Sequence, residues 1–197
     1  MARAARRPGT LIVVSSPSGG GKTTLVERVI RRVPRLARSV SVTTRTPRPG
    51  ERHGAHYRFI SVAAFRRSRL SRRLLEWAQV HHAWYGTPRA PIDRALARGR
   101  DVILSIDVQG ARQLKRRFGE RAVLVFLLPP SLIDLKRRLL RRRTDAPEAI
   151  RHRLREARRE LACAHWYDYA IVNQRLHEAV TQLEAVIVAQ RLRVSHR

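Results

Sequence analysis

The sequence predicts an α/β fold in which a parallel sheet is flanked by helices. Three observations lead to this prediction. Short apolar runs of four to seven residues recur along the chain, longer amphipathic segments separate them, and the first run leads directly into a glycine-rich turn. Strands buried in a parallel sheet are continuous apolar runs, whereas helices that cover the sheet have one apolar face. The 197 residues are enough for one well-packed domain.

Each element can be assigned to a stretch of the chain. The apolar runs predict strands over 10–14, 102–106, 122–128 and 169–172. The amphipathic segments predict helices over 22–33, 89–98, 108–118, 131–142, 147–164 and 176–193. The region 38–88 alternates apolar and polar residues and contains turn-forming prolines and glycines. We therefore expect a small, partly antiparallel insert there, at the ligand-binding edge of the sheet.

The charge is the most unusual bulk property. Lysine and arginine total 42 against 15 acidic residues, the formal net charge is +27, and only three of the cations are lysines. Such a field attracts polyanions and phosphates. One interpretation is nucleic-acid binding; the other, which we favour, is that arginine occupies solvated helix faces where lysine would serve equally. We expect no specific nucleic-acid partner, although non-specific, salt-sensitive RNA binding fits the charge.

The sequence has no pattern for membrane insertion or secretion. No run approaches the ~20 apolar residues of a membrane span, and the basic N-terminus lacks the apolar segment of a secretory signal. The single cysteine, Cys163, excludes an intrachain disulfide and fits a reducing cytoplasm, which is the predicted location. The histidine pairs His53/His56 and His81/His82 lack a tetrahedral ligand set, so we expect no metal site among them.

The glycine-rich turn covers residues 15–24, SSPSGGGKTT, between the first predicted strand and helix. Glycines let the backbone wrap closely around an anion, and the free N–H groups at a helix start attract phosphate. Lys22 would reach the β- and γ-phosphates, and the Thr23 hydroxyl would ligate Mg²⁺. The pattern is a P-loop with Ser16 in place of its first glycine. Its predicted triphosphate-binding residues are Ser16, Pro17, Ser18, Gly19, Gly20, Gly21, Lys22 and Thr23.

The insert carries candidates for binding the phosphate acceptor. In residues 41–51, SVTTRTPRPGE, Arg45 and Arg48 lie three apart around a turn that proline stiffens. Two guanidinium groups can clamp one phosphate through bidentate hydrogen bonds. Tyr57 follows, and residues 76–88, EWAQVHHAWYGTP, add a carboxylate, a further tyrosine and a hydroxyl.

These stretches resemble the guanylate kinase family. The segments SPSGGGKTT, SVTTRTPRPGE, EWAQV, YGTP, SIDVQGARQLK, FLLPPSLIDLKRRL and YAIVN occur in the family's order and at its spacing, over roughly residues 10–190. The pair TTRTPRPGE and YGT is far more specific than the P-loop alone. The resemblance implies a P-loop NTPase fold with a small GMP-binding insert and a helical lid. It also implies phosphoryl transfer from ATP to GMP, giving ADP and GDP, with Mg²⁺ as cofactor.

The resemblance further implies a role for each matching residue. Those at the GMP phosphate would be Arg45, Arg48, Tyr57 and Tyr85, and those at the guanine Ser41, Glu76 and Thr87. At the ATP phosphates the lid would supply Arg138, Arg142 and Arg153, while Asn173 would lie near the adenine and Asp107 between the nucleotides. The implied catalytic residues are Lys22, Arg45, Asp107, Arg138 and Arg153. Guanine offers adjacent N1–H and N2–H₂ donors to the Glu76 carboxylate, whereas adenine lacks the 2-amino group.

The family's organisation implies one domain of three parts. The P-loop core would comprise 1–37, 89–129 and 167–197, the GMP-binding subdomain 38–88, and the largely helical, arginine-rich lid 130–166. Three positions depart from the usual pattern. Ser105 stands where an aspartate is common, Arg143 replaces a frequent lid glycine, and Gln174 and Arg175 replace a common acidic pair.

Other functions stay open from the sequence. A related kinase for a different phosphorylated acceptor would also use the P-loop, and a non-catalytic guanylate-kinase-like module would bind phosphoproteins. The intact Lys22 favours catalysis, and Arg45, Arg48 and Glu76 together favour GMP as the acceptor. The expected partners are the small molecules ATP and GMP, and we expect a monomer or a homodimer.

Overall fold

The computed structural model describes residues 8–80, 82–140 and 147–194. Five strands form one sheet in the order β2-β7-β1-β8-β9. They are β1 (Leu11–Ser15), β2 (Leu36–Arg38), β7 (Asp101–Ser105), β8 (Ala122–Leu128) and β9 (Tyr169–Val172). The pairs β2/β7 and β8/β9 are parallel, with Leu36 opposite Asp101 and Val125 opposite Tyr169. The predicted α/β class with a parallel sheet is confirmed.

Helices occupy the amphipathic segments that the sequence predicts. They are α1 (Lys22–Arg32), α3 (Arg89–Ala97), α4 (Val108–Phe118), α5 (Leu132–Leu140), α6 (Pro147–Leu161) and α7 (Leu176–Leu192), with 3₁₀ turns η1 (Gly119–Arg121) and η2 (Ala164–Trp166). Each of the six helices lies inside its predicted range. The strands β1, β7, β8 and β9 lie within one residue of theirs. The predicted helix 131–142 runs past residue 140 into a segment outside the described residues.

A second sheet lies within residues 38–88 and has the order β4-β3-β6-β5. Its strands are β3 (Val42–Thr43), β4 (Arg58–Phe59), β5 (Leu74–Val80) and β6 (Ala83–Pro88). The pair β3/β4 is parallel, whereas β3/β6 and β5/β6 are antiparallel, so the partly antiparallel character expected here is present. The helix α2 (Val62–Leu70) was not predicted; only one of its side chains, Phe65, is buried.

The described residues divide into two compact units. The first unit falls within Met1–Leu11, Arg35–Leu104 and Gln109–Ala122, and the second within Ile12–Pro34, Ser105–Val108 and Val123–Arg197. In the first unit Val42, Phe65 and Leu74 form a small core, against which Trp77 and Trp84 pack. The three-part domain division expected from the sequence stays a prediction.

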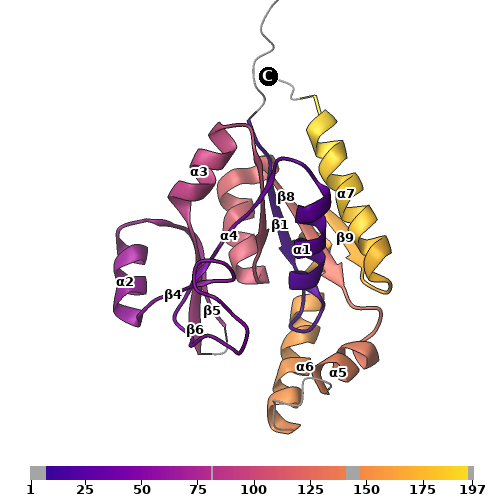
Figure 1. Cartoon of the computed structure of the whole chain (residues 1–197). Helices are drawn as coiled ribbons and strands as arrows, with labels where there is room; N and C mark the ends of the chain where they lie inside the picture. The colour runs from indigo at the N-terminus through magenta and orange to yellow at the C-terminus, as the bar shows by residue number, and fades with distance from the viewer. Residues whose placement is uncertain (1–7, 81, 141–146, 195–197) are drawn as a thin grey trace, which may run out of the picture. The chain divides into compact units, whose positions relative to one another are not determined.

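The core of the second unit includes the facing sides of α5 and α6. Leu135 and Leu139 of α5 pack with Ile150 and Ala157 of α6, and α7 lies along α1 and β9 (Figure 1). Since both leucines also approach Gly19, this small core supports the turn that follows β1. Among the described helices, none is both long and apolar enough to cross a membrane.

Candidate active site

The glycine-rich turn of the second unit has the geometry of an anion cradle. Gly19 and Gly21 have φ values of 90° and 92°, a conformation that disfavours any side chain. A Cβ on Gly21 would lie 2.4 Å from the side-chain amide nitrogen of Asn173, so any other residue there would displace that amide. Because α1 begins at Lys22, the unpaired N–H groups of its first turn adjoin the cradle and favour a bound phosphate.

Lys22 is held at this turn by backbone carbonyls. Its ammonium group donates hydrogen bonds to the carbonyl oxygens of Ser16 and Ile106, each at 3.2 Å. Burial lowers the pKa of Lys22, while the carboxylates of Glu160 and Asp107 oppose that shift. The cation is therefore positioned beside the cradle before any phosphate binds.

Glu160, on α6, is a site residue that the sequence analysis did not identify. Burial raises the pKa of Glu160 to about 7, and Asp107 adds to the rise, whereas Lys22 and the backbone N–H of Ser18 favour the ionised form. A carboxyl group thus stands next to the phosphate turn and titrates near neutral pH. Packing of α6 brings it there, and no local motif in the sequence could have indicated it.

A hydrogen-bond network ties the end of β9 to the same turn. The buried Asn173 amide donates to the Gly20 carbonyl oxygen at 2.8 Å, and Arg138 of α5 donates to the Asn173 carbonyl oxygen at 3.0 Å. Asn173 therefore bonds to the backbone of the phosphate turn, and Arg138 is linked to the turn through Asn173. Arg153 is a half-buried residue of α6. Arg142 and Arg143 lie outside the described residues.

Oxygen donors suited to a hard divalent cation lie near the turn. Thr23 is an exposed residue in the first turn of α1, and Asp107 follows β7 and interacts electrostatically with Lys22. The Ser15 hydroxyl donates to the Asp107 carbonyl oxygen at 3.4 Å. Hydroxyl, carboxylate and phosphate oxygens are the ligands that Mg²⁺ takes. Within the described part of the chain, no three His, Cys, Asp or Glu side chains cluster as a metal site.

In the first unit, Arg45 is the centre of a cluster of residues expected at the GMP phosphate. Its terminal nitrogens donate to both carboxylate oxygens of Glu51 at 2.6 Å, and its Nε donates to the Tyr85 hydroxyl at 3.1 Å. Its guanidinium carbon lies 5.1 Å from the centre of the Tyr57 ring, and the Tyr57 and Tyr85 rings are 5.9 Å apart. Three of the four residues expected at the GMP phosphate are thereby brought together.

Glu51 organises this loop and was given no role from the sequence. Its carboxylate also accepts the backbone N–H of Arg48 at 2.8 Å, and the bond to Arg45 lowers the pKa of Glu51 to about 2. The same bond raises the pKa of Arg45. Burial raises the pKa of Tyr57. The available signal was an acidic residue inside the basic stretch RTPRPGE, in a chain with few acids.

The residues expected at the guanine lie on the same sheet. Glu76 of β5 is only 3% exposed and accepts a hydrogen bond from the Thr87 hydroxyl of β6 at 2.6 Å. Ser41 precedes β3, and its carbonyl oxygen accepts the Arg58 N–H at 2.9 Å. A buried carboxylate held by a hydroxyl is a specific acceptor for a ligand with paired N–H donors.

Comparisons with known proteins agree with this geometry. The family model described as guanylate kinase matches residues 8–190. The guanylate kinase of Rhizobium etli is 46% identical over 97% of this chain and 87% of its own length, and that of Carboxydothermus hydrogenoformans is 48% identical over 96% and 94%. A crystal structure of guanylate kinase from Anaplasma phagocytophilum superposes with a TM-score of 0.82 at 30% identity, covering 96% of this chain and 89% of that one. The chain therefore belongs to the guanylate kinase family.

Proposed function

We propose that this protein is an ATP:GMP phosphotransferase, which converts ATP and GMP into ADP and GDP. The observation that carries the proposal is the buried Glu76–Thr87 pair on the sheet that also holds Arg45, Tyr57 and Tyr85. The carboxylate can accept the two guanine donors, and the guanidinium can bind a phosphate. Both groups belong to one small sheet, and together they match a guanosine monophosphate. The family relationship supports the same activity.

The turn at residues 16–23 would bind the triphosphate of ATP. Its backbone N–H groups would face the phosphates, and the Lys22 ammonium would exchange its carbonyl partners for β- and γ-phosphate oxygens. Asn173 would keep the turn in shape through Gly20. The charge of the phosphates would also favour protonated Lys22 against the desolvation that lowers its pKa.

The divalent ion of this family is proposed to be Mg²⁺, held by Thr23 and, through water, by Asp107. When bound, Mg²⁺ would neutralise charge on the phosphate oxygens. Because residue 105 is a serine, Asp107 is the one acidic residue in the sequence segment 104–107. Glu160 adds a carboxyl group from α6, and its proximity to Lys22 makes it a positioning residue for the ammonium.

The first unit would bind GMP at both the phosphate and the base. Arg45, Arg48, Tyr57 and Tyr85 would hold the phosphate, and Ser41, Glu76 and Thr87 would hold the base. Glu51 keeps Arg45 in a fixed orientation, so little side-chain entropy is lost when the phosphate arrives. AMP would present an acceptor at N1 to the Glu76 carboxylate and would bind poorly.

Transfer would proceed in line from the γ-phosphoryl group to a GMP phosphate oxygen. The protein supplies position and positive charge, because phosphoryl transfer needs little covalent help. Lys22, Arg45, Arg138 and Arg153 are the proposed sources of that charge, with Arg142 as a further lid arginine. The lid would exclude water, which would otherwise compete with GMP as acceptor. We propose a cytoplasmic location, consistent with the free thiol of Cys163.

An assay of ADP release with GMP, dGMP, AMP, UMP and ribose 5-phosphate as acceptors tests the function. GMP is expected to be strongly preferred. Lys22→Ala should lower kcat by at least about 100-fold, since it removes a donor to the developing charge, while leaving GMP binding largely intact. Glu76→Gln should erode the preference for GMP over AMP. Preference for a sugar phosphate would identify the related-kinase alternative, and GMP binding without turnover would identify a non-catalytic module.

A further inference from the structure

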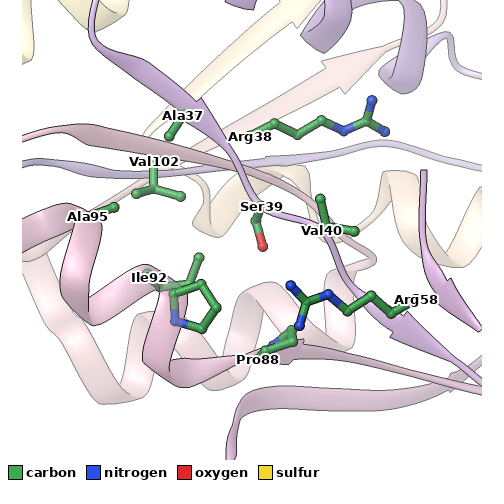
Figure 2. A pocket seen from close by; sticks show the side chains of 10 residues that line it. Ala37, Arg38, Ser39, Val40, Arg58, Pro88, Ile92, Ala95 and Val102 are labelled. Atoms are coloured by element: carbon green, nitrogen blue, oxygen red, sulfur yellow. The ribbon is translucent and has the colours of Figure 1, made fainter. Parts of the chain in front are cut away.

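The first unit contains a hollow whose lining residues neither nucleotide is proposed to use. It measures about 200 Å³ and lies between α3, the segment that follows β2, and the side chain of Arg58 from β4 (Figure 2). Its walls are mainly apolar and include Val40, Pro88, Pro91, Ile92, Ala95 and Val102. The volume exceeds the about 150 Å³ of an apolar cavity that binds benzene. The hollow can therefore hold one ring-sized molecule.

Ser39 brings an unsatisfied hydroxyl to this hollow. Its Oγ is buried and has no hydrogen-bond partner among the described residues, although its backbone N–H donates to the Ile103 carbonyl oxygen at 3.0 Å. Figure 2 shows the hydroxyl directed into the hollow. Buried polar side-chain atoms nearly always have a partner, so an unpartnered hydroxyl at a pocket wall indicates a position for a ligand acceptor.

Arg58 brings a positive charge to the same place. Its guanidinium group extends toward Ser39 and Pro88 in Figure 2, and the residue is exposed, so the long side chain can move to admit a ligand. Within the described part of the chain it has no acidic partner. A guanidinium fork recognises a carboxylate through two parallel hydrogen bonds.

We infer that this hollow binds a small monocarboxylate whose apolar body is about the size of a benzene ring. The carboxylate would accept hydrogen bonds from the Arg58 guanidinium and the Ser39 hydroxyl, and the ring would contact Ile92, Ala95 and Val102. Arg38 also lines the hollow, but its guanidinium is directed away from Ser39 in Figure 2. A phosphate dianion fits less well, because Arg58 and the Ser39 hydroxyl alone would leave part of its charge uncompensated among apolar walls.

The hollow adjoins the proposed GMP residues without including them. Val40 precedes Ser41, Arg58 follows Tyr57, and Pro88 follows Thr87. The Arg58 N–H also donates to the Ser41 carbonyl oxygen at 2.9 Å. The carboxylate is therefore expected to bind together with GMP, and any effect of one ligand on the other must be reciprocal.

Benzoate is the probe for this site, titrated into the full-length protein and followed by NMR signals of the Ala95 and Ile92 methyl groups. For a molecule of this size we expect a Kd on the order of 1 mM. Arg58→Met should weaken benzoate binding at least tenfold, and Ser39→Ala about threefold. Arg66→Met, an exposed arginine of α2 outside the hollow, is the matched control and should change the Kd by less than twofold. Ala95→Leu, which fills the hollow from α3, should abolish binding while GMP binding persists.

Three results would overturn the inference. The first is equal benzoate affinity in the Arg58→Met and Arg66→Met variants. The second is complete competition between benzoate and GMP, which would place benzoate in the GMP pocket. The third is no shift of the Ala95 and Ile92 methyl signals up to 50-fold above the expected Kd. Neutral benzamide gives a further check, since its affinity should be the same in Arg58→Met as in the unmodified protein. All these readouts are binding measurements, so they stand whether or not phosphoryl transfer is observed.

Discussion

At the residue scale, hydrogen bonds hold the Arg45 side chain in one orientation. Glu51 accepts from both of its terminal nitrogens and also from the Arg48 N–H, so one carboxylate sets the shape of the loop 45–51. In Glu51→Gln an amide N–H₂ would face the guanidinium, and we expect KM for GMP to rise about tenfold, as a charged hydrogen bond is worth about 1.5–3 kcal/mol. Glu178→Gln, which removes the exposed ion pair with Arg175 on α7, is the control and should leave KM unchanged. Equal KM values in both variants would contradict the role of Glu51.

The Thr87 hydroxyl gives a second residue-scale prediction. It donates to the buried Glu76 carboxylate at 2.6 Å, so Thr87→Val removes a charged hydrogen bond at almost constant volume. The free energy of unfolding should fall by about 1–3 kcal/mol, and KM for GMP should rise. Thr181→Val on α7 loses only an exposed bond to the His177 carbonyl oxygen and should cost less than about 0.5 kcal/mol. Urea denaturation of both variants measures the difference.

At the scale of elements, the turn between β1 and α1 depends on Gly21 for two separate reasons. Its φ is positive, and a Cβ there would also meet the Asn173 amide at 2.4 Å. Gly119 has a positive φ of 55° but open space around it, so Gly119→Ala isolates the conformational cost, about 1–2 kcal/mol. Gly21→Ala should cost more stability than Gly119→Ala and raise KM for ATP at least tenfold. If the two variants have the same KM for ATP, the steric argument is wrong.

The sequence could predict some of the strands and helices but not others. Apolar runs located β1, β7, β8 and β9, because strands inside a parallel sheet have no polar face to interrupt the run. The strand β2 was missed, since only Leu36 of its three residues is buried. The helix α2 was missed because Phe65 is its only buried side chain, which leaves no stripe of period 3.6.

The candidate site residues fall into two groups, those in local sequence motifs and those brought close by folding. Lys22, Arg45 and Glu76 lie in local motifs and could be predicted from neighbouring letters. The partners that orient them depend on folding. Glu160 reaches Lys22 from α6, and the hydrogen bond from Asn173 to Gly20 joins residues 153 positions apart. No pattern in one sequence encodes such a contact, because it arises from tertiary packing.

At the scale of the whole molecule, two carboxyl groups should make the free energy of unfolding depend on pH in opposite directions. The pKa of Glu160 rises from 4.5 to about 7, so the folded protein keeps a proton that the unfolded chain loses. Its contribution to the free energy of unfolding therefore falls as pH rises from 4.5 to 7, by at most about 3 kcal/mol. The pKa of Glu51 falls to about 2, so its contribution is present above pH 4.5 and is lost as pH falls through 2.

Urea denaturation at pH 4.5, 6 and 7.5 isolates the Glu160 effect. The unmodified protein should lose stability relative to Glu160→Gln over this range, because the amide cannot titrate. The exposed Glu148, which pairs with Arg151 on the same helix, supplies the control: Glu148→Gln should keep the slope between pH 4.5 and 7.5. The difference in free energy of unfolding between Glu160→Gln and the unmodified protein could also stay constant with pH. That result would show that the pKa of Glu160 does not change on folding.

The charge of +27 gives the last whole-molecule prediction, since repulsion among arginines opposes the compact state. Raising NaCl from about 0.1 to 1 M shortens the screening length from about 10 to about 3 Å, which should raise Tm. The exposed residues Arg112 and Arg116 are four apart on α4, and like charges at that spacing destabilise a helix. Replacing both with Gln should therefore stabilise the protein at low salt and reduce its response to NaCl. An equal salt response in the two proteins would mean that repulsion between Arg112 and Arg116 does not limit the stability of the chain.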